Sequence, residues 1–206
     1  MPARCSDRGA AHSREPVCSA RERRQTVCAT GAFDGNGVLH WIGTGCGTKE
    51  YANPHGKPGG VVAKMSSVYD DHACTPSRFV EHAPLNQENY TNSMANSWMS
   101  VDLGEGRHLA PDYYCLRHGN NYGDGFHRLL HWRLEGSNDD STWTLLKTHA
   151  NDQALPNQGY STASWPIEAT ADGASYRYFR IFQTGKNSGG YDFLLCAGIE
   201  LYGLLR

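Results

Sequence analysis

The chain has 206 residues, 39% of them hydrophobic, and a formal net charge of −2. This length is enough for one domain of sandwich or barrel size with a core that needs no metal or disulfide. The nearly balanced charge gives no global field that would favour nucleic acid. No segment approaches the roughly 18 uninterrupted apolar residues of a membrane span, so membrane insertion is not expected either.

The first 30 residues differ in composition from the rest. Apolar residues are sparse there, and residues 1–28 carry six arginines against three acidic residues, a local net charge of +3. The apolar core of a secretory signal is missing. We therefore expect a basic, irregular arm over residues 1–30 and one domain over residues 31–206. The composition of the arm indicates no particular role.

Short segments rich in β-branched and aromatic residues follow, each bounded by turn-forming residues. Such segments are typical of strands, and none carries a sustained helical apolar stripe. The predicted strands are, in chain order, Val38–Ile42, Val61–Ser66, Trp98–Leu103, Tyr113–His118, Leu130–Ser137, Trp143–His149, Ser161–Trp165, Arg177–Gln183 and Phe193–Tyr202. One helical turn is predicted at Phe79–Leu85. Many strands without intervening helices predict an all-β sandwich or barrel.

Alternation along the strands predicts which side chains enter the core. In residues 130–135, Leu130, Trp132 and Leu134 point one way and the polar residues between them point the other way. Arg180 interrupts the apolar pattern of its segment, so we expect it to be partly buried with a carboxylate partner.

The segment Ser137–Ser141 joins two predicted strands and contains Asn138, Asp139 and Asp140. Asn and Asp side chains bond to their own backbone and tolerate unusual φ angles, which favours a turn. Calcium needs about six to eight oxygen ligands, which one short turn cannot supply alone. We therefore predict a tight turn here and no metal.

The seven cysteines are irregularly spaced and form no C-x-x-C motif. Cys115 and Cys196 lie in apolar runs and are expected to be small buried hydrophobic residues. Reduced thiols in a cytosolic or nuclear setting are the simplest interpretation, and we expect an intracellular, cytoplasmic location. No G-x-S-x-G motif is present, and the glycine-rich Gly43–Lys49 lacks the spacing of a phosphate loop. We therefore expect no enzymatic activity and no cofactor.

Four further motifs, in order, resemble those of discoidin domains, also called coagulation factor 5/8 type C domains. Trp98–Gly104 resembles their W-x-x-V-D-L-G strand, and Leu134–Trp143 resembles their hairpin with S-x-D-x-x-x-W. Arg177–Ile181 resembles their R-Y-x-R-I strand, and Gly198–Gly203 resembles their closing G-x-E-L-Y-G strand. The resemblance implies a galactose-binding-like jelly-roll β-sandwich over about residues 38–203.

Further segments indicate a subgroup within this family. Trp41–Thr44, Tyr114–Gly119, Thr162–Ile167 and Gln183–Ser188 resemble the intracellular discoidin-like domains of HECT-type ubiquitin ligases and BTB proteins. This resemblance implies a non-catalytic interaction module, and ligase activity does not transfer because the catalytic lobe is absent here. Secreted members commonly carry a cysteine after the last strand, and this chain does not. Residues 84–97 lack an Asp-rich loop, so no calcium is expected.

The predicted binding site lies in two glycine-rich loops that follow strands. Loops on a rigid scaffold commonly carry function, and these offer amides, a cation and an aromatic ring. The candidate residues are Arg117, His118, Asn120, Tyr122, Asp124, Gln183, Lys186, Asn187 and Tyr191. The favoured function is protein–protein interaction within a multi-subunit complex. The alternative is carbohydrate binding, for which Asn120, Tyr122, Asn187 and Tyr191 are suitable, and a third, weaker hypothesis is an enzyme of unknown type.

Overall fold

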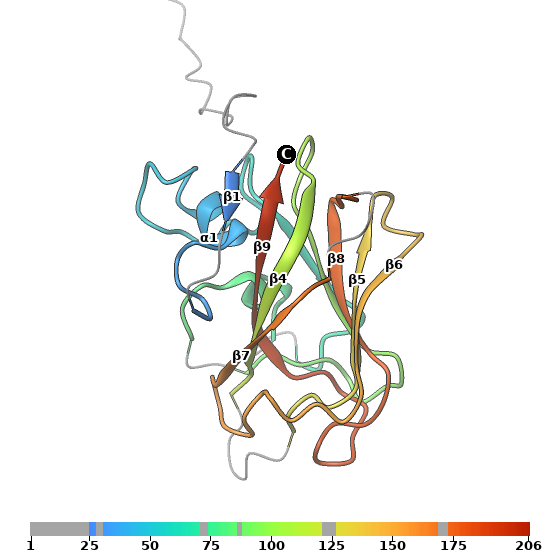
Figure 1. Ribbon diagram of the computed structural model, residues 1–206. Helices are drawn as coiled ribbons and strands as arrows, with labels where there is room; N and C mark the ends of the chain where they lie inside the picture. Colours follow the sequence, from blue (N-terminus) through green and yellow to red (C-terminus); the bar gives the residue numbers. More distant parts are fainter. Residues whose placement is uncertain (1–24, 28–30, 71–73, 86–87, 121–126, 169–172) are drawn as a thin grey trace, which may run out of the picture.

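The computed structural model describes residues 25–27, 31–70, 74–85, 88–120, 127–168 and 173–206. Within these residues two antiparallel β-sheets pack face to face (Figure 1). The predicted all-β sandwich is therefore confirmed, and only two short helices accompany the described strands.

The first sheet has the strand order β1-β9-β4-β7. Its two longest strands, β4 (Leu109–His118) and β9 (Cys196–Leu205), pair antiparallel at its centre. β7 (Thr162–Pro166) pairs with the other side of β4. β1 (Gln25–Val27) pairs with the C-terminal end of β9, so the segment expected to be irregular contains at least one short strand.

The second sheet has the strand order β2-β3-β8-β5-β6 and is also antiparallel throughout. Its strands are β2 (Val62–Met65), β3 (Trp98–Asp102), β5 (Trp132–Ser137), β6 (Thr144–His149) and β8 (Tyr178–Gln183). Each of the five falls within or close to a strand predicted from alternation.

The core lies between the two sheets and follows the predicted alternation within β5, whereas before this strand Leu129 is buried and Leu130 is only half-buried. Trp132 and Leu134 are fully buried, whereas Arg133 between them is half-exposed. From the neighbouring strand β8, Phe179 and Ile181 enter the same layer with no exposed surface. Each such side chain contributes about 1.5–3 kcal/mol through burial, which fixes the register of the strands.

Arg180 lies on the outer face of β8 and has the carboxylate partner that was predicted. Its Nε is 2.6 Å from Oε2 of Glu135 on the adjacent strand β5. The guanidinium also lies 4.1 Å from the ring centroid of Trp143. This pairing explains how a cation is accommodated in a largely apolar strand.

One predicted strand is wrong, because Val38–Ile42 forms most of helix α1 (Val38–Gly43). The backbone N–H groups of Leu39 and His40, free at the start of the helix, donate to the buried carboxylate of Glu200 at 2.8 and 3.0 Å. Burial raises the pKa of Glu200 to about 7, and these N–H donors oppose that rise. A short apolar run fits a buried strand and a buried helix equally well, and this tertiary contact decides between them.

The helical turn predicted at Phe79–Leu85 is observed as a 3-10 helix, η1 (Pro76–Val80), displaced toward the N-terminus. Pro76 explains the displacement, since a proline with its fixed φ fits the first turn of a helix. Phe79 and Val80 are buried and attach this turn to the core.

Three described cysteines, Cys74, Cys115 and Cys196, are free and buried, as expected for Cys115 and Cys196. Cys46 is disulfide-bonded, so the expectation of uniformly reduced thiols is wrong at this position. Irregular spacing in the sequence does not reveal which cysteines meet in space. None of the described helices is long and apolar enough to cross a membrane.

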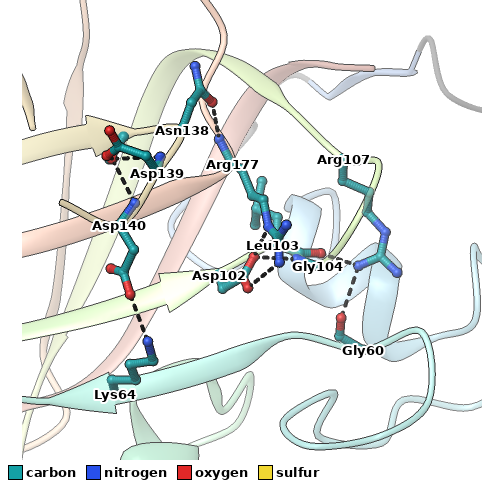
Figure 2. A network of polar contacts seen from close by, with 11 residues as sticks. Gly60, Lys64, Asp102, Leu103, Gly104, Arg107, Asn138, Asp139, Asp140 and Arg177 are labelled. Atoms are coloured by element: carbon teal, nitrogen blue, oxygen red, sulfur yellow. Dashed lines mark hydrogen bonds and ion pairs between the residues drawn. The ribbon is translucent and has the colours of Figure 1, made fainter. Parts of the chain in front are cut away.

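The segment between β5 and β6 is a turn held by its own side chains, as predicted (Figure 2). Asp139 Oδ1 accepts hydrogen bonds from the backbone N–H groups of Ser141 (2.9 Å) and Thr142 (2.6 Å). These donors hold the pKa of the Asp139 carboxyl well below its usual range. Asp140 adopts a positive φ of 58° and pairs with Lys64 at 2.7 Å. No group of three or more metal-ligating side chains occurs among the described residues.

A second set of polar contacts ties this turn to strands β3 and β8 (Figure 2). The guanidinium of Arg177 donates two hydrogen bonds to the carboxylate of Asp102, at 2.6 and 2.7 Å. The backbone N–H of Arg177 donates to Asn138 Oδ1 at 3.0 Å. The polar side chains at this end of the sandwich are therefore used in internal contacts.

Candidate binding site

Arg117 and His118, at the end of β4, are buried and already engaged within the protein. Arg117 donates hydrogen bonds to the carbonyl groups of Glu81 (3.1 Å) and His82. His118 Nδ1 lies 2.7 Å from the carbonyl oxygen of Gly119, and burial lowers the pKa of this histidine. The neutral ring therefore donates from Nδ1. Both side chains support the fold beneath the loops.

Gln183 and Lys186 belong to the second predicted loop and differ in exposure. Gln183 is buried and donates to the carbonyl oxygen of Gly185 at 2.9 Å. Lys186 is exposed, and its ammonium lies 3.0 Å from the Asp192 carboxylate of the same loop. Neither side chain is directed into a cavity by these contacts.

Asn187 is buried and organises the loop that carries Tyr191. Its Oδ1 accepts hydrogen bonds from the N–H groups of Gly189 and Tyr191, both at 3.0 Å. Its Nδ2 donates to the carbonyl oxygen of Phe193 at 3.2 Å. Because three loop residues are bonded to one side chain, the rings of Tyr191 and Phe193 are held in place.

Two of the predicted residues, Asn120 and Tyr191, line a cavity of about 340 Å³. It lies at the end of the sandwich where β4 ends and β9 begins, the lower end of Figure 1. We call it the aromatic pocket. Its lining residues are Tyr69, Glu88, Tyr90, Ser93, Asn120, His127, Tyr191, Phe193 and Leu195. The predicted residues Tyr122 and Asp124 lie outside the described residues.

The rings of the aromatic pocket form a continuous row. Tyr69 stacks on Tyr90 with 4.6 Å between ring centroids, and Tyr90 lies 5.5 Å from Phe193. Phe193 stacks in turn on Tyr191 at 5.4 Å, and His127 meets Phe193 edge-on at 4.9 Å. Such stacked, tilted and edge-to-face pairs stabilise one another and hold the rings at the wall of the cavity.

The pocket combines exposed rings with one carboxylate. Tyr69 and Tyr191 are 58% and 49% exposed, although large aromatic side chains are usually buried. Burial raises the pKa of Tyr90, and the charge of the nearby Glu88 carboxylate raises it further. Tyr90 is therefore a neutral phenol over the physiological range, while the carboxylate is the charged group of the lining.

The sequence did not point to Tyr69, Tyr90, His127 or Phe193. These residues come from four separate segments, and only the fold brings them together. An isolated bridge between Tyr90 and Leu195 joins two of the segments just before β9. An available signal was the number of tyrosines in polar loop segments, since exposed aromatic residues in loops are enriched at binding surfaces.

A larger cavity of about 560 Å³ lies near the opposite end, and its lining includes four glycines, Trp41 and the charged residues Lys57, Glu105, Arg107 and Arg206. The guanidinium of Arg107 is used there in hydrogen bonds to backbone carbonyls, including Gly60 at 3.1 Å (Figure 2). Arg107 therefore serves the fold at this cavity, and the cavity lacks the row of aromatic rings that lines the aromatic pocket.

A buried chain of hydrogen bonds between the sheets has the outline of a catalytic triad. Trp132 Nε1 donates to the Tyr114 hydroxyl (3.0 Å), which lies 2.6 Å from Nε2 of His149. Nδ1 of His149 lies 2.6 Å from Asp152 Oδ2, which also accepts from Trp165 Nε1 at 3.0 Å. Since the indole donates to the hydroxyl, the hydroxyl donates to Nε2, and Nδ1 carries the proton toward Asp152.

This chain lacks the properties of a catalytic nucleophile and base. Tyr114 has no exposed surface, and burial raises the pKa of its hydroxyl well above the usual value. Burial also lowers the pKa of His149, which stacks on Trp132 with 3.9 Å between centroids. A hydroxyl that is closed off from solvent and harder to deprotonate than usual is a packing group rather than a nucleophile.

Sequence comparison relates the chain to segments of much longer proteins. It is 36% identical over 191 residues to the E3 ubiquitin-protein ligase Ufd4 of Drosophila melanogaster, matching 89% of this chain and 7% of that protein. It is 34% identical over 208 residues to a BTB/POZ domain-containing protein of Arabidopsis thaliana, matching 93% of this chain and 24% of that protein. It is 34% identical over 177 residues to the E3 ubiquitin-protein ligase hecd-1 of Caenorhabditis elegans, matching 83% and 6%. No family model matches the chain.

Two solved structures that share the fold are a carbohydrate-binding module and a lectin. A CBM32 module from Clostridium perfringens, in complex with GalNAc-β-1,3-galactose, aligns with a TM-score of 0.52 at 13% identity, covering 69% of this chain and 95% of that one. A fucolectin from striped bass (Morone saxatilis) aligns with a TM-score of 0.51 at 12% identity, covering 70% and 45%. At these identities the likeness concerns the fold.

The fold is thus that of the galactose-binding-like sandwiches, in which carbohydrate-binding modules are found. The sequence is similar to segments of two E3 ubiquitin-protein ligases and a BTB/POZ domain-containing protein, in agreement with the resemblance that the sequence motifs predicted. It spans less than a quarter of the length of each of these relatives.

Proposed function

We propose that this chain is a non-catalytic module that binds a protein partner through the aromatic pocket, as part of a larger intracellular assembly. The observation that carries the proposal is that Tyr69 and Tyr191 are exposed to solvent and line the aromatic pocket, at the end of the sandwich where β4 ends and β9 begins. Aromatic side chains at the centre of a concave surface are the usual anchors of protein interfaces.

The relatives favour a protein partner over a free ligand. Each match is a domain-sized part of a long protein, and two of these proteins are ubiquitin ligases by name. A ligase must gather a substrate and other proteins, so an accessory domain with an exposed aromatic pocket is suited to recruitment. The absence of catalytic character in the Tyr114–His149 contact supports a binding role.

Proximity labelling with the full chain tests this function. The variant carries Tyr69→Ala and Tyr191→Ala, and Leu145→Ala is the matched control because Leu145 is 54% exposed on strand β6, outside the pocket. We expect the double variant to lose a defined set of labelled proteins that wild type and Leu145→Ala retain. Identical sets for all three proteins would reject the aromatic pocket as the partner site.

Carbohydrate binding is the second candidate, and the solved neighbours favour it. A CBM32 module and a fucolectin share the fold, and tyrosine rings beside an Asn side chain suit a pyranose face and its hydroxyl groups. Glycan-array binding that Tyr191→Ala abolishes would support this candidate. No binding at millimolar glycan would exclude it.

A further inference from the structure

We infer that the aromatic pocket recognises the alkylammonium group at the end of a lysine side chain of its partner. This inference rests on the proposed function and names the chemistry by which the same pocket would select a partner. Three observations carry it: the row of rings, the Glu88 carboxylate in a lining without lysine or arginine, and the size of the cavity.

Four aromatic rings line one small volume. Tyr69, Tyr90, Phe193 and Tyr191 follow one another with centroid separations of 4.6, 5.5 and 5.4 Å. A cation within about 6 Å of a ring face is attracted by the quadrupole of the ring, and several rings around one point add their attraction. Neutral aliphatic groups gain only the burial of their surface there.

The charge of the lining has the sign that a cation requires. Glu88 is half-buried and is the one carboxylate among the described lining residues, which include no lysine or arginine. Its charge acts on Tyr90, whose pKa it raises, so the carboxylate lies close enough to the rings to act on a ligand among them. Of the neighbouring cations, Lys186 pairs with Asp192 at 3.0 Å, and Arg78 donates to the backbone carbonyl of Glu88 at 2.6 Å.

The dimensions of the pocket suit a side chain rather than a whole peptide. A volume of about 340 Å³ is at the lower end of the range of about 300–1,000 Å³ for small-ligand pockets. Tyr90 and Phe193 are half-buried, whereas Tyr69 and Tyr191 at the two ends of the row are exposed. A long, unbranched side chain with a charge at its tip can therefore reach the inner rings from solvent.

Nuclear magnetic resonance titration of the full chain tests the inference with three small probes. These are Nα-acetyl-lysine methylamide, its Nε-trimethyl form and its Nε-acetyl form, which keeps the chain but loses the charge. We expect shifts at the amides of Glu88 and Tyr191 with both cationic probes. The acetylated probe should bind at least about fivefold more weakly, since it loses the cation–π and carboxylate attraction.

Two variants separate the carboxylate from the rings. Glu88→Gln keeps the size and polarity of the side chain and should weaken the cationic probes about three- to tenfold. Glu105→Gln is the matched control, because Glu105 is an exposed carboxylate in the loop between β3 and β4. It should leave the affinity unchanged. Tyr69→Ala and Tyr191→Ala should each weaken both cationic probes.

The outcomes distinguish a failure of the lysine-recognition inference from a failure of the proposed function. Equal affinity for the lysine and acetyl-lysine probes, or an unchanged affinity in Glu88→Gln, would overturn the inference. If no lysine probe binds but the tyrosine variants still lose labelled partners, the ammonium chemistry is wrong and the proposed function stands. If galactose shifts the same amides and the lysine probes do not, the inference fails and the carbohydrate candidate replaces it.

Discussion

The hydroxyl group of Tyr114 gives the sharpest test of the core. Tyr114→Phe removes one oxygen atom and leaves the ring in place. That oxygen accepts a hydrogen bond from Trp132 Nε1 (3.0 Å) and donates one to His149 Nε2 (2.6 Å). Trp132 is fully buried between the sheets, and His149 is almost fully buried there. The substitution therefore leaves one donor and one acceptor without a partner. At about 1–2 kcal/mol for each buried unpaired group, we expect a loss of about 2–4 kcal/mol.

The assay is urea denaturation followed by far-UV circular dichroism, together with thermal unfolding. For a domain of this size, the expected loss corresponds to a midpoint lower by about 4–16 °C. Tyr113→Phe is the matched control, because the hydroxyl of Tyr113 is half-buried and makes a 3.3 Å contact with Ser164. It should cost less than about 1 kcal/mol. Equal losses for the two variants would refute the assignment of the buried hydrogen-bond chain.

Three further predictions concern pH, an ion pair and a glycine. Burial lowers the pKa of His82 to about 4, so the unfolded chain binds more protons than the folded protein below pH about 6.5. The free energy of unfolding therefore decreases as the pH falls from about 6.5 toward 4. His82→Gln should flatten this pH dependence in thermal unfolding between pH 7.5 and 5. Arg177→Lys replaces two hydrogen bonds to Asp102 by one and should lower the free energy of unfolding by about 1 kcal/mol in urea, whereas no change would mean that solvent screens the pair. Gly203→Ala should lower the free energy of unfolding by more than about 2 kcal/mol, because φ is 138° and a Cβ would lie 2.1 Å from a backbone carbonyl oxygen. Gly190→Ala is the control, because φ is 82° and a Cβ would meet open space, and it should cost about 1 kcal/mol. A similar loss for both variants would contradict the steric argument.

Most of the strands could be predicted because their alternation has a simple physical origin. Trp132 and Leu134 are buried and Arg133 is not, as a period of two requires. The ordered motifs, such as the closing Gly198–Gly203, lie on β9 and carry enough information to indicate the family. Val38–Ile42 was the exception, since a short run of four apolar residues and one histidine fits a strand or a helix, and the Glu200 carboxylate at its start favours the helix.

The candidate site was predicted less completely. The loop after β8 contributes Tyr191, and Asn187 holds that loop instead of facing a ligand. Arg117 and His118 have the chemistry of ligand-binding residues, but burial and local hydrogen bonds engage them within the fold. Whether a polar side chain faces solvent or the interior depends on what packs over it, which alternation along one strand cannot show.

By itself, the sequence determined the β-architecture and the resemblance to discoidin-like domains, because side-chain alternation, turn residues and short motifs are local properties of the chain. The tertiary structure alone decided where the exposed aromatic rings gather. Tyr69, Tyr90 and Tyr191 lie far apart in the sequence and meet only because the sheets bring their loops to one end of the sandwich. Long-range contacts of this kind depend on strand order and loop path, which no local pattern encodes.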